Sequence, residues 1–121
     1  ANYPTRFLAD CIRGRKLTTL EHGVHLLTQV PAELFGLRDR GTLSEGAHAD
    51  MVLFDPLLIE SEMLTMVDDL PGGTSRLYAG SVGVNHVFVS GVEVVRNSEA
   101  TGELPGSIIR SGVDTDTVAL N

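Results

Sequence analysis

The sequence predicts an α+β fold in which helices come first and antiparallel strands follow. Between residues 4 and 36, apolar side chains recur at the spacing of one helical face, and glycines close the periodic segments. From residue 51 onward, apolar residues instead form short runs that turn-forming glycines separate, as is typical of strands. With 121 residues, of which 42% are hydrophobic, the chain is long enough to bury a single core.

The first predicted helix begins near Pro4, because proline is tolerated in a first helical turn, and it ends at Gly14. Its apolar face consists of Phe7, Leu8, Cys11 and Ile12. We expect Cys11 to be a buried core residue rather than a reactive thiol.

The second predicted helix begins at Thr18, whose hydroxyl can accept the amide of Glu21 while the Glu21 carboxylate reaches back, as in a capping box. Its core-facing stripe consists of Leu20, Val24 and Leu27. Pro31 then starts a further helical turn, for which Gly36 is a natural C-terminal cap.

The strand predictions start with Met51–Phe54, a continuous apolar run expected to be covered on both faces. Residues 60–83 are expected to be an irregular excursion. Ser90-Gly91 lies between two valine-rich segments and predicts a hairpin over residues 87–95, because Gly91 supplies the positive φ of a tight turn. Ile108 and Ile109 are expected to form a last short strand, and residues 111–121 a flexible tail.

Composition excludes several classes of partner. The net charge is −7 and Lys16 is the only lysine, which argues against nucleic acid and anionic membrane surfaces as partners. No apolar run is long enough to cross a bilayer, and no signal peptide is visible. The lone Cys11 cannot form an internal disulfide and fits a reducing compartment, so we expect a cytoplasmic location.

The histidines are the first candidates for chemistry. His22 and His25 are three residues apart on a predicted helix and could share one metal ion, but no third ligand can be placed beside them. We therefore interpret them as part of a solvated helix face. His48 and Asp50 could form an oriented imidazole–carboxylate pair. Because this pair follows a turn and precedes a strand, we instead expect Asp50 to cap backbone amides.

Known motifs for catalysis, phosphate binding and calcium binding are also absent from the sequence. The sequence contains no Gly-x-Ser-x-Gly elbow, no phosphate-binding loop that precedes a helix, and no complete calcium-binding loop. We therefore predict no catalytic, cofactor-binding or metal-binding residue in this chain.

An ordered series of motifs carries a family resemblance. It begins with Thr18, Leu20 and Glu21, and continues with LLTQVPAELFGLRDRGTLSEGAHADMVLFD over residues 26–55, VNHVFVSGVEVV over residues 84–95 and TGELPGSIIR over residues 101–110. Over residues 2–112 this series resembles the C-terminal end of metal-dependent amidohydrolases, and in particular the N-acyl-D-amino-acid deacylases, or D-aminoacylases.

The resemblance implies a division of the chain. Residues 1–40 would be outer helices of an incomplete TIM-like barrel, and residues 41–110 would be antiparallel strands of a small β-sandwich assembled from both ends of a longer protein. Asp50 and Asp55 would then be structural residues that flank a strand. No residue matches the family's metal ligands, so zinc or a similar divalent ion is expected only in the complete enzyme, where a metal-bound hydroxide would attack the amide carbonyl.

The resemblance also implies partners. The remainder of the parent chain would cover the helical face, and the segment alone would be inactive. In isolation, residues 1–40 are expected to self-associate or to be partly disordered, because their apolar stripe would lack its strands. An alternative is a free-standing or complementing small α+β binding module without catalysis, which would use an open strand edge.

Overall fold

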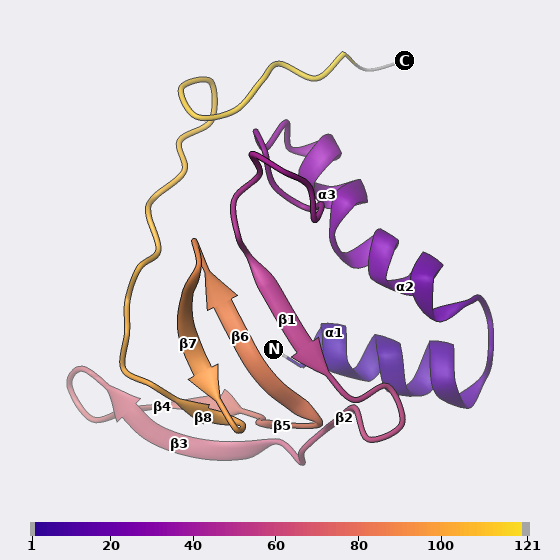
Figure 1. Ribbon diagram of the computed structural model, residues 1–121. Helices are drawn as coiled ribbons and strands as arrows, with labels where there is room; N and C mark the ends of the chain where they lie inside the picture. The colour runs from indigo at the N-terminus through magenta and orange to yellow at the C-terminus, as the bar shows by residue number, and fades with distance from the viewer. Residues whose placement is uncertain (1, 120–121) are drawn as a thin grey trace.

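The computed structural model describes residues 2–119 and confirms the α+β fold, with helices at the start and antiparallel strands after them (Figure 1). The helices are α1 (Tyr3–Arg6), the wide π-helix η1 (Phe7–Gly14), α2 (Leu20–Leu27) and α3 (Gln29–Leu34). The strands are β1 (Met51–Phe54), β2 (Glu60–Ser61), β3 (Thr65–Leu70), β4 (Thr74–Tyr78), β5 (Ser81–Val82), β6 (Val84–Val89), β7 (Val92–Arg96) and β8 (Glu99–Ala100). No helix within residues 2–119 is long and apolar enough to cross a membrane.

The helix ends follow the sequence signals with one shift. The first helical segment ends at Gly14, as predicted. The cap of α2 is Thr19 rather than Thr18, and its hydroxyl accepts the amide of His22 at 3.3 Å. The prediction of a Thr18 cap was wrong by one residue, because either threonine in this pair offers the same hydroxyl. At the end of α3, Gly36 has a φ of +62° and provides the left-handed cap that was predicted.

The buried core is small. Leu8 and Ile12 from η1 meet Ile59, which is the most deeply buried large side chain in the described residues at 2% exposure. Three residues of the predicted helical stripe, Leu20, Val24 and Leu27, are only partly buried against this cluster. Cys11 is also only partly buried, so the prediction that it lies in the core was too strong. The apolar stripe of α2 is therefore only partly covered.

Arg13 connects the helical and strand regions. Its guanidinium donates to the carbonyl oxygens of Leu57 at 3.0 Å and Ile59 at 2.6 Å, and it pairs with Glu60 at 2.9 Å. These bonds fix the loop after β1 against the end of η1. The loop thereby places the side chain of Ile59 in the core.

The main sheet has four antiparallel strands in the order β1-β6-β7-β8 (Figure 1). The predicted hairpin is confirmed as β6–β7, and both Ser90 and Gly91 have positive φ, at +50° and +80°. Strand β1 was predicted correctly in its bounds, but not as a strand covered on both faces. Val52 is 54% exposed and Leu53 is 50% exposed, and since consecutive side chains of a strand point to opposite faces, neither face of β1 is fully covered within the described residues.

Two segments differ from the sequence prediction. Residues 60–83 are not irregular: they hold the short ladder β2–β5 and a complete hairpin, β3–β4, which turns at Pro71, Gly72 and Gly73. Ile108 and Ile109 form no strand. They lie in an extended connection that runs from the sheet back toward α3 (Figure 1), so no neighbouring backbone is in place to form a ladder with them.

Candidate functional site

The two histidines on α2 do not assemble a metal site. The rings of His22 and His25 have centroids 6.1 Å apart. Within residues 2–119, no group of three or more His, Cys, Asp or Glu side chains is placed to hold a metal ion. The residues that the structure describes therefore do not fit the divalent metal that the resemblance implies for a complete enzyme.

Asp50 is a structural residue of the sheet. One carboxylate oxygen accepts the backbone amide of Ser90 at 2.8 Å, and the other pairs with the Arg40 guanidinium. Partial burial favours the neutral form and raises the pKa of Asp50, but the Ser90 amide and the positive charge of Arg40 stabilise the carboxylate more strongly. The net pKa of Asp50 therefore lies below its ordinary value. The expected capping role is confirmed, and the imidazole of His48 is not its partner.

Asp55 has a similar role at the other end of β1. Its side chain accepts the amide of Leu57 at 2.8 Å, and its backbone amide donates to the Gly83 carbonyl at 2.8 Å. Both aspartates that flank β1 therefore hold turns in place, as the resemblance implied.

A polar cluster lies on the β6–β7 hairpin. Glu93 accepts from Arg96 Nε at 2.6 Å and contacts His86 Nδ1 at 2.7 Å. The hydrogen bonds from Arg96 and His86 hold the pKa of Glu93 below its ordinary value. These three groups satisfy one another, so the arrangement fits a cross-strand salt bridge better than a catalytic constellation.

The larger hollow is an apolar groove of about 730 Å³ between the helices and the free edge of β1. Val24 and Leu27 of α2 line one side, Met51 to Phe54 line the other, and Ile59 lies in its lining as well. The half-exposed Val52 and Leu53 belong to this lining. A groove that combines apolar side chains with an unpaired strand edge is suited to receive another segment of polypeptide.

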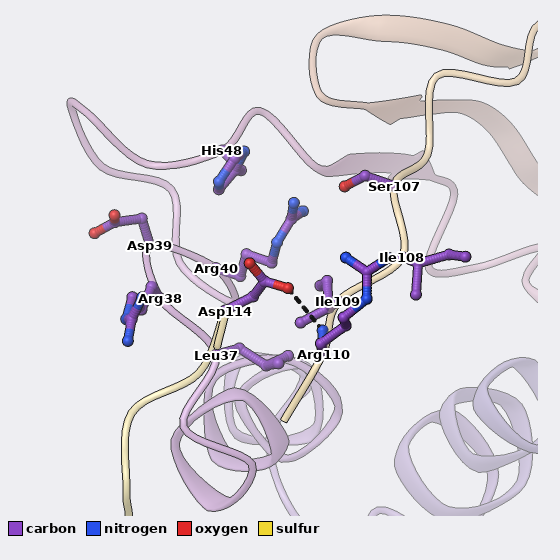
Figure 2. A pocket seen from close by; sticks show the side chains of 10 residues that line it. All are labelled: Leu37, Arg38, Asp39, Arg40, His48, Ser107, Ile108, Ile109, Arg110 and Asp114. Atoms are coloured by element: carbon purple, nitrogen blue, oxygen red, sulfur yellow. Dashed lines mark hydrogen bonds between the residues drawn. The ribbon is translucent and has the colours of Figure 1, made fainter. Parts of the chain in front are cut away.

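The second hollow is a polar pocket of about 440 Å³ (Figure 2). Its two walls come from distant parts of the chain, since one is formed by residues 37–40 with His48 and the other by residues 107–110 with Asp114. Figure 2 shows the side chains of Arg40, Arg110 and Asp114 directed into the space between the walls, whereas Arg38 points away from it.

Arg38 holds these walls together. It donates to Asp116 at 2.7 Å and to the carbonyl oxygens of Val113 and Thr115, each at 3.1 Å. The hydrogen bond and the negative charge of Asp116 raise the pKa of Arg38. An isolated β-bridge between Leu37 and Thr115 adds backbone contact. Asp114, which lies in the segment predicted to be a flexible tail, thus belongs to one wall of the pocket, a placement that no local sequence signal indicated.

Sequence reasoning selected neither Arg40 nor Arg110, because each lies in a turn-rich segment without a recognisable motif. Composition gives no signal either, because Arg110 shares the absence of an adjacent acidic residue with most other arginines of the chain, and Arg40 directly follows Asp39.

Comparison with known proteins gives a consistent result. Residues 3–95 match the model of the amidohydrolase family. The chain is 32% identical over 108 residues to an N-acyl-D-aspartate deacylase and 38% identical over 106 residues to an N-acyl-D-glutamate deacylase, both of Alcaligenes xylosoxydans xylosoxydans. It is also 33% identical over 104 residues to a D-aminoacylase of the same organism.

These alignments cover 86–89% of this chain but only 20% of each relative, so the chain spans about a fifth of the length of the curated proteins it matches. No solved structure matches the chain. The family match covers well over half of the residues and agrees with the motif series from Thr18 to Val95, so this chain belongs to the amidohydrolase family.

Proposed function

We propose that this chain is the C-terminal structural portion of an enzyme that hydrolyses the N-acyl amide bond of N-acyl-D-amino acids with a metal-activated water. The observation that carries this proposal is similarity to three deacylases over nearly the whole chain but only a fifth of theirs. The described residues do not fit a metal site, so the metal ligands and the reacting groups are assigned to the rest of the parent protein.

In this proposal the remainder of the parent chain occupies the apolar groove and pairs with the free edge of β1. Support comes from Val52 and Leu53, which are half exposed although they belong to a strongly apolar strand. Large apolar groups left on the surface in one place are typical of an interaction face. The helices and β1 then act as the frame that braces the catalytic domain. A cytoplasmic location is part of the proposal, because the lone Cys11 fits a reducing compartment.

The first test is the intact mass of the protein as its native cell produces it, followed by an assay of that protein on N-acyl-D-aspartate and N-acyl-D-glutamate. A product several times longer than 121 residues, with hydrolysis that a metal chelator abolishes, is the expected result. A native product of this length without hydrolysis would overturn the proposal and favour a free-standing or complementing binding module.

The groove can be tested in the same protein with Val52→Lys and a matched control, Leu104→Lys. Leu104 is 94% exposed and lies outside the groove. If other parts of the parent chain cover β1, the lysine at position 52 buries an unpaired charge and lowers the yield of folded enzyme sharply, while the control does not. Equal yields for the two variants would mean that the groove is open to water in the parent protein.

A further inference from the structure

The polar pocket between residues 37–40 and 107–114 combines groups of both charges. Among residues 2–119, no carboxylate lies within ion-pair distance of the Arg110 guanidinium, whereas six other arginines each have one. Arg110 therefore offers its donors to the pocket without an internal acceptor. A planar guanidinium in this situation is well suited to bind a carboxylate with two parallel hydrogen bonds.

Arg40 supplies fixed donors beside Arg110. Its side chain is 17% exposed and Asp50 holds it at one nitrogen, so its orientation is set before any ligand arrives. Figure 2 shows its guanidinium directed into the same space as that of Arg110, with the Ser107 hydroxyl and the His48 ring at the margin. The pairing with Asp50 neutralises the charge of Arg40, so Arg110 is the main source of positive potential.

Asp114 supplies the opposite charge. One of its oxygens, Oδ2, accepts the backbone amide of Arg110 at 2.8 Å, and no hydrogen bond within the described residues engages Oδ1. A simple anion would be repelled by this carboxylate, whereas a ligand that also carries an ammonium group would be attracted to it. The lining thus complements a molecule with a carboxylate at one end and a cationic nitrogen beside it.

Resting on the function proposed above, we propose that this pocket binds a free α-amino acid, with its carboxylate on Arg110 and Arg40 and its ammonium group on Asp114. A volume of about 440 Å³ admits such a molecule, and Leu37 and Ile109 in the lining would contact its side chain. Hydrolysis of an N-acyl amino acid releases a free amino acid. The pocket would therefore bind the product, at a site built by this chain.

The test is isothermal titration of the protein at its natural length with D-glutamate, glutarate and n-propylamine. Glutarate lacks the ammonium group and n-propylamine lacks both carboxylates of D-glutamate, so each removes one half of the expected recognition. We expect D-glutamate to bind at least about tenfold more tightly than either partial analogue, as the loss of one charged contact implies.

Two variants assign the signal to this pocket. Arg110→Gln should weaken D-glutamate and glutarate binding by about tenfold or more, and Asp114→Asn should weaken D-glutamate alone, because asparagine can still accept the Arg110 amide. Arg15→Gln is the matched control, since Arg15 is exposed at the end of η1 and lies outside the pocket.

The outcome separates this inference from the proposed function. A protein that hydrolyses N-acyl-D-glutamate but binds D-glutamate equally in the native, Arg110→Gln and Asp114→Asn forms would overturn the amino-acid site and leave the deacylase proposal intact. Binding of glutarate as tightly as D-glutamate would also overturn it, because the pocket would then recognise a carboxylate only.

Discussion

The two hairpins of this chain have strands of similar length but differ strongly in how far their residues are buried. β6–β7 and β3–β4 are antiparallel pairs of strands of five or six residues, each with a register shift within its ladder. The residues of β6 are mostly half buried within the four-stranded sheet, whereas nearly every residue of β3 and β4 is exposed. An isolated two-stranded hairpin is marginal in water. The difference lies in the neighbours, since β6 pairs with β1 while β3–β4 pairs with nothing else in the described residues.

Besides its ladder with β1, contacts at both ends anchor β6–β7 to the rest of the molecule, and β3–β4 has no equivalent in the described residues. At the start of β6–β7, the backbone of Gly83 lies close to that of Leu58 and Ile59, and at its turn the Ser90 amide donates to Asp50. The β3–β4 hairpin is held by its own ladder and by Arg76, which pairs with Asp69 and lies over the Tyr78 ring. This comparison predicts a graded set of mutational effects.

Gly83→Ala should have the largest effect. An added Cβ would lie 2.8 Å from the backbone nitrogen of Ile59, and the φ of +78° is strained for any L-residue. Crowding and strain together should lower the free energy of unfolding by about 3 kcal/mol. The control is Gly46→Ala, where φ is +87° but nothing lies within 4 Å, and strain alone should cost about 1 kcal/mol. Equal urea midpoints for the two variants would contradict the anchoring role of Gly83.

Asp50→Asn should have an intermediate effect at neutral pH. Asparagine can accept the Ser90 amide, but it presents no charge to Arg40, and we expect a loss of about 1–2 kcal/mol in the free energy of unfolding. Asp10→Asn is the control, because Asp10 is half exposed and forms only a 3.4 Å pair with Arg6. If urea unfolding gives the same free energy for both variants, Asp50 does not anchor the hairpin turn.

Low pH should abolish the stabilising contribution of the Asp50 carboxylate in the native protein. The folded state lowers the pKa of Asp50, so its contribution is fully present above the unfolded pKa of about 4 and is lost as pH falls through the lower folded value. The stability difference between the native protein and Asp50→Asn should therefore shrink below about pH 4. A difference that stays constant from pH 7 to pH 3 would show that the charge of Asp50 is not responsible.

Arg76→Gln should have the smallest effect on the whole molecule. Both partners of its ion pair are about half exposed, and the pair connects only β3 to β4. We expect an unchanged global unfolding midpoint and faster amide hydrogen exchange confined to residues 65–78. Slower folding or a lower midpoint would mean that β3–β4 is coupled to the sheet.

The contrast between the hairpins also explains what the sequence could predict. Ser90-Gly91 between valines is a strong local signal, and it located β6–β7. In β3–β4 the adjacent Asp68 and Asp69 break the alternation of apolar residues, and the exposed strands leave no buried pattern to detect. The position of Asp50 between a turn and a strand was likewise enough to predict its capping role. The Ser90 amide that it accepts lies 40 residues away, however, and could be identified only in the structure.

The polar pocket could not be predicted from the sequence for the same reason. Arg40 and Arg110 come together because Arg38 and the Leu37–Thr115 bridge bind the segment from Val113 to Asp116, and no periodic pattern encodes such contacts. Ile108 and Ile109 illustrate the opposite error. Their β-branched side chains favour a strand, yet a strand requires a partner, and propensity cannot supply one.

Gly23 shows how packing can outweigh helix propensity at a single position. It lies inside α2, where alanine would be favoured by about 1 kcal/mol. An alanine Cβ there would lie 2.8 Å from Cδ1 of Ile12, a side chain already buried in the core. A design procedure that optimises helix formers would choose the wrong residue, and a saturation library should be depleted of every larger side chain at this position. The absence of one methyl group thus sets the spacing between η1 and α2.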